Sequence, residues 1–91
     1  MTRDPAWYSD IRELVAEYAA AGRIDARTGA ALRDRLLRAE RHGVAGRDAA
    51  ASAQLLQVVA VATKDIRGDR AARDAVLRPT LALIAIVALV D

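Results

Sequence analysis

The end of the chain is its most uniformly apolar part. After Thr80, ten apolar residues follow one another from Leu81 to Val90, before Asp91. A helix that is apolar on all sides must be covered on all sides. That cover comes from a compact bundle, a second copy of the chain, a partner domain or a membrane. A membrane-spanning helix needs about 20 apolar residues, so this segment is too short to cross a bilayer.

The composition predicts an all-α fold. The chain has 91 residues, which is enough for a single domain spanning residues 1–91. It contains no Phe and only 3% aromatic residues, whereas Ala, Leu and Arg, which favour helices, are abundant. Because Ala buries little surface, the core must be built from Leu, Ile and Val on closely packed helices.

Charge and cysteine content exclude several classes of function. The net charge of +2 is too balanced to require a polyanionic partner. The absence of Cys excludes disulfides, thiolate chemistry and zinc–thiolate sites. The start of the chain, MTRDPAWYSDIREL, lacks the apolar core of a secretory signal. We therefore expect a cytoplasmic protein as the sequence is written, or a secreted one if it has been excised from a longer protein.

Glycines and capping residues divide the sequence into four predicted helices, over residues 5–21, 26–42, 48–66 and 70–90. The predicted N-terminal caps are Asp4, Asp25 and Asp69, and the predicted stops are Gly22, Gly43 and Gly68. Short connections favour antiparallel neighbours, so the sequence predicts an up-and-down four-helix bundle. Pro79 removes a backbone hydrogen bond inside the last helix. We expect a kink near Pro79, the alternative being a break after which Thr80 caps a restarted helix.

Helical periodicity assigns the core. Trp7 and Tyr8 are adjacent, so they cannot both face the interior. Trp7 fits the apolar stripe, which leaves Tyr8 more exposed, either over the bundle end or on a binding surface. Gly29 lies within the second helix and costs about 1 kcal/mol relative to Ala, which predicts a close neighbouring backbone. The predicted core residues are Trp7, Ile11, Leu14, Val15, Tyr18, Ile24, Leu32, Leu36, Ala39, Leu55, Leu56, Val58, Val59 and Ala62.

The apolar C-terminal segment has two different sides when drawn as a helix. One arc is mostly small and contains Leu81, Ala82, Ala85, Ala88 and Leu89; the other is bulky and contains Leu83, Ile84, Ile86, Val87 and Val90. Burial of both sides follows if this is the central helix of the bundle, or if one side meets another subunit. The small arc is therefore the candidate interface. A β-strand is the alternative, but Ala at every third position fits a helix better.

The sequence predicts no catalytic, cofactor or metal site. His42 lies in the last turn of a predicted helix, where it interacts with free carbonyl groups. Ser9 and Ser52 have no base at a suggestive spacing. We therefore expect that the protein is not an enzyme.

Charged residues on the first two helices leave two readings open. Asp10, Glu13 and Glu17 share one face of the first helix, and we expect them to be solvated or paired with Arg27 and Arg38 rather than to hold a cation. On the second helix, Arg27, Arg38 and Arg41 fall on one side, with Asp34 among them. Exposed arginines contact phosphates, so these three are the candidate anion-binding residues.

Three strings carry a family resemblance: LVAEYAAAGRI over residues 14–24, ALRDRL over 31–36 and QLL over 54–56. The chain resembles the FIMAH-type helical module, in which a helix ends in Tyr-x-x-x-Gly-x-Ile and is followed by a Leu-x-x-x-Leu helix and a helix with Gln-Leu. The resemblance covers residues 11–66. It implies a small helical bundle appended to larger bacterial proteins, often secreted or surface enzymes, without catalysis of its own. It also implies that the fold-determining residues are Tyr18, Gly22, Ile24, Leu32 and Leu36.

The interpretation that follows is a non-catalytic protein–protein interaction or assembly module, homodimeric through the C-terminal helix. The alternative is a small helical protein that binds an anion or nucleic acid through its Arg-rich second helix.

Overall fold

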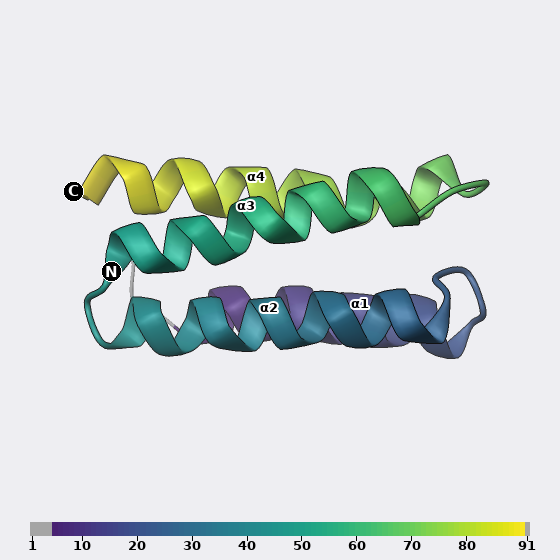
Figure 1. Cartoon of the computed structure of the whole chain (residues 1–91), viewed down its shortest axis with the longest axis horizontal. Helices are drawn as coiled ribbons and strands as arrows, with labels where there is room; N and C mark the ends of the chain where they lie inside the picture. Colours follow the sequence, from purple (N-terminus) through teal and green to yellow (C-terminus); the bar gives the residue numbers. More distant parts are fainter. Residues whose placement is uncertain (1–4, 91) are drawn as a thin grey trace.

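The computed structural model describes residues 5–90 of the chain, and the side chains of residues 6–88. This part forms four helices and contains no strand: α1 (Pro5–Ala20), α2 (Ala26–Val44), α3 (Asp48–Asp65) and α4 (Arg70–Val90). Figure 1 shows two layers, with α1 beside α2 and α3 beside α4. The all-α prediction is confirmed, and the strand alternative for the C-terminal segment is wrong.

The helices follow one another around the bundle, which measures 36 × 17 × 16 Å. Within the described residues, α2 packs against α1 and α3, and α4 packs against α3 and more lightly against α1. The diagonal pairs, α1 with α3 and α2 with α4, have no Cα atoms within 8 Å of each other in that part of the chain. This confirms the up-and-down bundle. It also places α4 at a corner, so of the two alternatives for this segment, a central position in the bundle is wrong.

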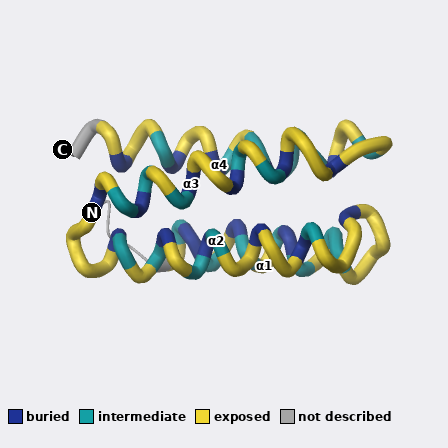
Figure 2. The backbone as a smooth tube through the Cα atoms, in the orientation of Figure 1, coloured by how far each residue is buried: buried dark blue, intermediate teal, exposed yellow. Residues whose placement is uncertain are grey.

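Buried positions line the interior between the two layers (Figure 2). Most predicted core residues are buried, among them Val15, Leu32, Leu36, Leu55 and Val58. Leu56 is the clear exception, because it is 56% exposed on the outer side of α3. Its neighbour Leu55 points inward. Adjacent residues on a helix point in directions about 100° apart, so Leu56 points outward.

The assignment of the two adjacent aromatic residues is wrong. Tyr8 is fully buried and has the largest side chain among the fully buried residues, whereas Trp7 is only half-buried. The reason lies on α2, where Gly43 has no side chain and leaves room for the Tyr8 ring.

Glycines at positive φ end the first two helices. Gly22 has φ of 75°, and Arg23 N–H donates to the carbonyl of Tyr18 at 2.9 Å. The same arrangement recurs at Gly46, with φ of 82° and Arg47 N–H donating to the carbonyl of His42 at 2.8 Å. Both are Schellman caps. The stop at Gly22 is confirmed, whereas the end of α2 belongs to Gly46 and not to Gly43, which lies buried inside the helix.

Two predicted N-terminal caps are confirmed. Asp25 accepts hydrogen bonds from the backbone N–H groups of Arg27 and Thr28, and Asp69 accepts one from Ala72 N–H at 2.9 Å. Asp4 lies outside the described residues. Gly29 does have a close neighbour, but it is a side chain and not the predicted backbone: a Cβ at Gly29 would lie 3.1 Å from the Cβ of Ala19 on α1.

The last helix continues through Pro79 without a break. Thr80 is fully buried, and its hydroxyl donates to the carbonyl of Val76 at 2.7 Å. Thr80 therefore lies inside a continuous helix, and the alternative of a restarted helix capped by Thr80 is wrong. A bend at Pro79 stays a prediction.

Candidate functional site

The predicted interface residues on α4 face outward. Leu81 is 51% exposed, and Ala82, Ala85 and Ala88 are also exposed. The side chain of Leu89 lies outside the described residues. From Pro79 to Val90 the sequence contains no charged residue, so this half of α4 presents an uncharged outer face. We call it the α4 face and define it by Leu81, Ala82, Ala85 and Ala88.

The bulky arc of the same helix faces inward only in part. Leu83 and Val87 are buried, and Ile84 is half-buried against the core. Ile86 is 38% exposed. Ile86 lies toward α1, where the contact between helices is lightest, and this explains its exposure.

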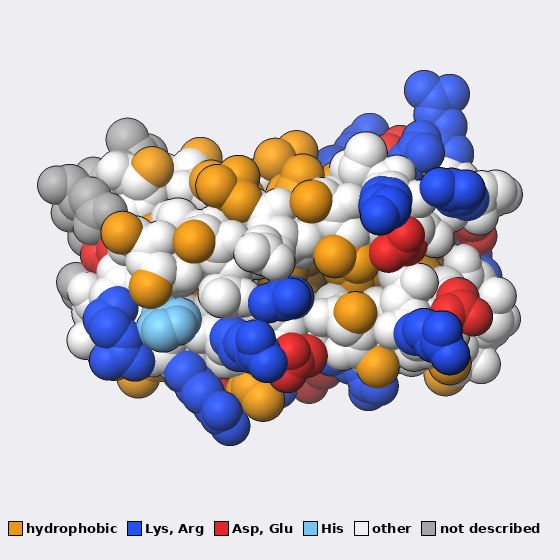
Figure 3. All heavy atoms as spheres, in the orientation of Figure 1, with side chains coloured by type: hydrophobic (Ala, Val, Ile, Leu, Met, Phe, Trp, Pro, Cys, Tyr) orange, Lys and Arg blue, Asp and Glu red, His pale blue; other side chains and the backbone are white. Residues whose placement is uncertain are grey.

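A shallow hollow lies where α4 meets α1. It has a volume of about 250 Å³, and its lining includes Trp7, Pro79, Ala82 and Ile86. The half-buried Trp7 thus extends the α4 face toward α1. Figure 3 shows hydrophobic side chains gathered along the edge of the molecule formed by α3 and α4.

The candidate anion-binding residues on α2 do not converge. Arg27, Arg38 and Arg41 are all exposed, but Arg27 lies about 16 Å along the helix from Arg38. Arg38 pairs with Asp34 on its own helix at 3.2 Å. In Figure 3 the basic side chains are interleaved with acidic ones. The predicted pairing of Arg38 with the acidic row of α1 is not what the structure shows.

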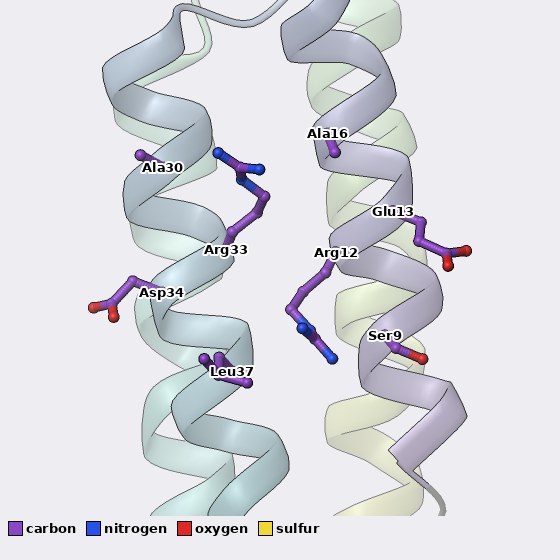
Figure 4. A pocket seen from close by; sticks show the side chains of 8 residues that line it. All are labelled: Ser9, Arg12, Glu13, Ala16, Ala30, Arg33, Asp34 and Leu37. Carbon is purple, nitrogen blue, oxygen red and sulfur yellow. The ribbon is translucent and has the colours of Figure 1, made fainter.

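A different pair of arginines, Arg12 of α1 and Arg33 of α2, lines a hollow between these two helices. The hollow has a volume of about 480 Å³ and is lined by Ser9, Arg12, Glu13, Ala16, Ala30, Arg33, Asp34 and Leu37. In Figure 4, Arg12 and Arg33 extend from the two helices into the gap between them. Arg12 also donates to Glu40 at 2.6 Å. Sequence analysis missed this pair, because residue spacing within each helix gives no register between helices.

The buried end of Tyr8 lies near acidic groups. Its hydroxyl has no hydrogen-bond partner among the described residues. Burial raises the pKa of Tyr8 above its usual value, and the negative charges of Asp48 and Glu40 raise it further. At neutral pH the phenol is therefore neutral and acts as packing.

The other candidate residues have structural contacts. His42 accepts a hydrogen bond through Nδ1 from Nε of Arg47 at 3.0 Å, next to the cap at Gly46. The Ser9 hydroxyl donates to the carbonyl of Ala6 at 3.3 Å. The described part of the chain contains no group of three His, Asp or Glu side chains arranged to hold a metal ion.

Arg23 connects two turns that lie at the same end of the bundle. Its guanidinium donates twice to Asp69, at 2.8 and 3.1 Å, and lies 4.7 Å from the centre of the Tyr18 ring. The hydrogen bonds from Arg23 and from Ala72 N–H lower the pKa of Asp69 to about 2. One side chain thus joins the turn after α1 to the start of α4.

Four antiparallel helices with one uncharged outer face define a small all-α bundle domain. The FIMAH domain model matches residues 8–85, a range that includes parts of all four helices. The chain belongs to the FIMAH domain family, which confirms the resemblance seen in the sequence. Comparisons with curated proteins and with solved structures find no significant match. Among the described residues, no helix has both the length and the apolar content needed to cross a membrane.

Proposed function

We propose that this FIMAH domain is a non-catalytic protein–protein interaction or assembly module that docks through the α4 face. The observation that carries the proposal is the exposure of this uncharged surface. Four large hydrophobic side chains are more than a third exposed in the described part of the chain, and two of them, Leu81 and Ile86, lie on the C-terminal half of α4. Contiguous exposed apolar surface rimmed by polar residues is typical of interaction sites.

Burial of this surface provides the driving force for docking. Removing apolar surface from water contributes about 25 cal/mol per Å². The neighbouring Trp7 adds a half-buried aromatic side chain at the edge of the α4 face, and aromatic residues are enriched in interfaces. Charged residues, which oppose burial, are absent from this half of the helix.

Site-specific photocrosslinking in the source cells tests the proposal. A photoreactive amino acid replaces Leu81, and in a control chain it replaces Ala31, which is exposed on α2 away from α4. We expect covalent protein adducts from position 81 and none from position 31. Equal labelling at the two positions, or no adduct at position 81, would contradict the proposal.

A second candidate function is binding of an anion or a nucleic acid. It is favoured by the exposure of Arg27, Arg38 and Arg41 and by the approach of Arg12 and Arg33 to one hollow. Such binding weakens steeply as salt concentration rises. Fluorescence anisotropy with labelled DNA and RNA at several salt concentrations separates the two functions. We expect no salt-sensitive binding; a strong salt-dependent affinity that is lost in Arg33→Gln would favour the second candidate.

A further inference from the structure

The hollow between α1 and α2 lies between two points where these helices are in close contact. At one point the Tyr8 ring fills the space beside Gly43. At the other, the Cβ of Ala19 lies 3.1 Å from the place that a Cβ on Gly29 would occupy. The hollow, with a volume of about 480 Å³, occupies the stretch between these contacts. Since the spacing of the helices is fixed on both sides of it, the hollow is a built feature of this helix pair.

Two arginine side chains reach into the hollow from opposite helices. The antiparallel register brings Arg33 of α2 level with Ala16 of α1, whose methyl group leaves room for a guanidinium. Figure 4 also shows that Arg12 of α1 extends toward the level of Leu37 on α2. The hollow therefore has a cationic group on each side and small or apolar side chains between them.

The two acidic residues that border the hollow point away from it. In Figure 4, Glu13 projects from the outer side of α1 and Asp34 from the outer side of α2. Asp34 pairs with Arg38 on its own helix at 3.2 Å. Neither carboxylate lies in the gap between the two helices, so the space beside the guanidinium groups is available to a ligand.

The charges around the hollow leave one positive charge without a counterpart among the described residues. Arg12 donates to Glu40 at 2.6 Å, and this ion pair compensates one of the two arginines. The exposed Arg33 side chain forms no ion pair or hydrogen bond in that part of the chain. In addition, Nε of Arg12 is buried and has no hydrogen-bond partner there. The hollow thus offers one net positive charge and several N–H donors.

We propose that this hollow binds one carboxylate carried on a short apolar stem, as in a glutamate side chain or a small organic acid. A carboxylate brings a single negative charge, which matches that of Arg33, and its two oxygens fit the planar fork of a guanidinium. The half-buried Ala16 and Leu37 receive the apolar stem. A phosphate group carries about 1.5 to 2 negative charges. Its second charge has no counterpart in the hollow, where Glu13 and Asp34 lie at the rim.

This inference goes beyond both functions proposed above. It concerns the layer of α1 and α2, whereas the α4 face belongs to the layer of α3 and α4 (Figure 1). A nucleic acid is bound through several phosphate contacts along a surface, whereas this hollow takes one monoanion. Binding of a carboxylate is therefore expected whether or not the α4 face docks with a partner.

A nuclear magnetic resonance titration of the whole chain tests the proposal, with butyrate as the probe and butyramide as its uncharged counterpart. The side-chain Nε–H signals of the arginines report on binding directly. We expect butyrate to shift the signals of Arg33 and Arg12 with a dissociation constant of about 1–20 mM, and butyramide to shift neither. The signal of Arg41, which is exposed on α2 outside the hollow, is the internal control. A shift that does not saturate, or an equal shift at Arg41, would overturn the inference.

Two substitutions test the charge and the shape of the hollow separately, with backbone amide signals as the readout. Arg33→Gln removes the charge and is expected to weaken butyrate binding at least about tenfold, whereas Arg41→Gln leaves it unchanged. Ala16→Leu fills the hollow without changing its charge and is expected to weaken binding by about the same factor. Ala31→Leu, at an exposed position of α2 outside the hollow, is its control. Circular dichroism checks that each variant remains helical. Unchanged affinity in Arg33→Gln or in Ala16→Leu would overturn the inference.

Two further probes identify the source of the carboxylate. A blocked pentapeptide with one glutamate among glycines represents a protein partner, and the same peptide with glutamine is its control. Tighter binding of the glutamate peptide than of butyrate supports a protein segment as the ligand, and tighter binding of butyrate supports a small organic acid. Inorganic phosphate is expected to bind more weakly than butyrate. Tighter binding of phosphate would overturn the assignment of a carboxylate site.

Discussion

The hydroxyl of Tyr8 occupies the space that a side chain on Gly43 would need. A Cβ at position 43 would lie 3.0 Å from Cζ of Tyr8 and closer still to the hydroxyl oxygen. Tyr8 belongs to α1 and Gly43 to α2, and both are buried. The two helices pack closely at this point because the largest fully buried side chain meets a residue with none.

Gly43→Ala is expected to lower the free energy of unfolding by about 1–3 kcal/mol, since the added methyl group overpacks the contact with Tyr8. This loss exceeds the gain of about 1 kcal/mol from replacing Gly by Ala in a helix. Urea denaturation measures the change. The control is the same substitution in a Tyr8→Phe background, where the cost should be smaller. An increase in stability would show that the Tyr8 ring moves aside freely.

Tyr8→Phe is expected to stabilise the protein by about 1 kcal/mol at neutral pH. The Tyr8 hydroxyl is buried without a hydrogen-bond partner among the described residues, and removing such a group relieves its desolvation cost. Urea denaturation of the two proteins side by side gives the difference. A loss of stability would indicate that a bound water satisfies the hydroxyl.

The difference in stability between wild type and Tyr8→Phe should grow at high pH. Burial, with Asp48 and Glu40, raises the folded-state pKa of Tyr8 above the unfolded value of 10.0. The contribution of the neutral phenol is therefore complete below pH 10.0 and decreases as the pH rises toward the folded-state pKa. Wild type should lose stability above pH 10.0 more steeply than Tyr8→Phe. Parallel curves would contradict this assignment.

The contact between Arg23 and Asp69 should make stability depend on acid pH. The pKa of Asp69 falls from 3.8 to about 2, chiefly through its hydrogen bond from Arg23 and then that from Ala72 N–H. Its contribution is therefore present above pH 3.8 and is lost as the pH falls through about 2. Arg23→Gln should lower the melting temperature at neutral pH. It should also reduce the loss of stability that wild type shows as the pH falls below 3.8. Arg67→Gln, an exposed arginine whose Nε donates to the carbonyl of Lys64, is the control and should behave as wild type.

The loss of stability on substituting Gly22 should depend only on how readily the new residue adopts the left-handed backbone conformation. Its φ is 75°, and a Cβ there would meet no described atom within 4 Å. Gly22→Ala is expected to cost about 1–2 kcal/mol, because L-residues are disfavoured in the left-handed region. Gly22→Asn should cost less and Gly22→Val more. Urea midpoints that do not follow this order would show that the cap is not the origin of the effect.

Local chemistry in the sequence predicted the helices and several of their ends. The caps at Asp25 and Asp69 and the stop at Gly22 depend on groups within five residues of one another. Gly43 and Gly46 show where this reasoning fails. Both are plausible stops three residues apart, and the buried position of Gly43 depends on Tyr8, 35 positions earlier in the chain.

Composition and helical periodicity selected the small arc of the last helix as the candidate interface, and its role as an interface stays a prediction. Helical periodicity correctly separated the small and bulky arcs of the last helix, and the absence of charge identified the segment as one that needs cover. Whether the small arc faces the other three helices or solvent depends on the order of the helices around the bundle. That order places α4 at a corner and leaves Ala85 exposed.

Hydrogen bonds and backbone preferences act over one or two turns of helix, so helix content, most caps and the periodic core can be deduced from the residues in order. The choice of Tyr8 over Trp7 as the buried aromatic, the meeting of Arg12 with Glu40 and the outward direction of the α4 face each depend on a helix distant in the sequence. These features became fixed when the four helices packed, because the space available to a side chain is set by its neighbours in three dimensions.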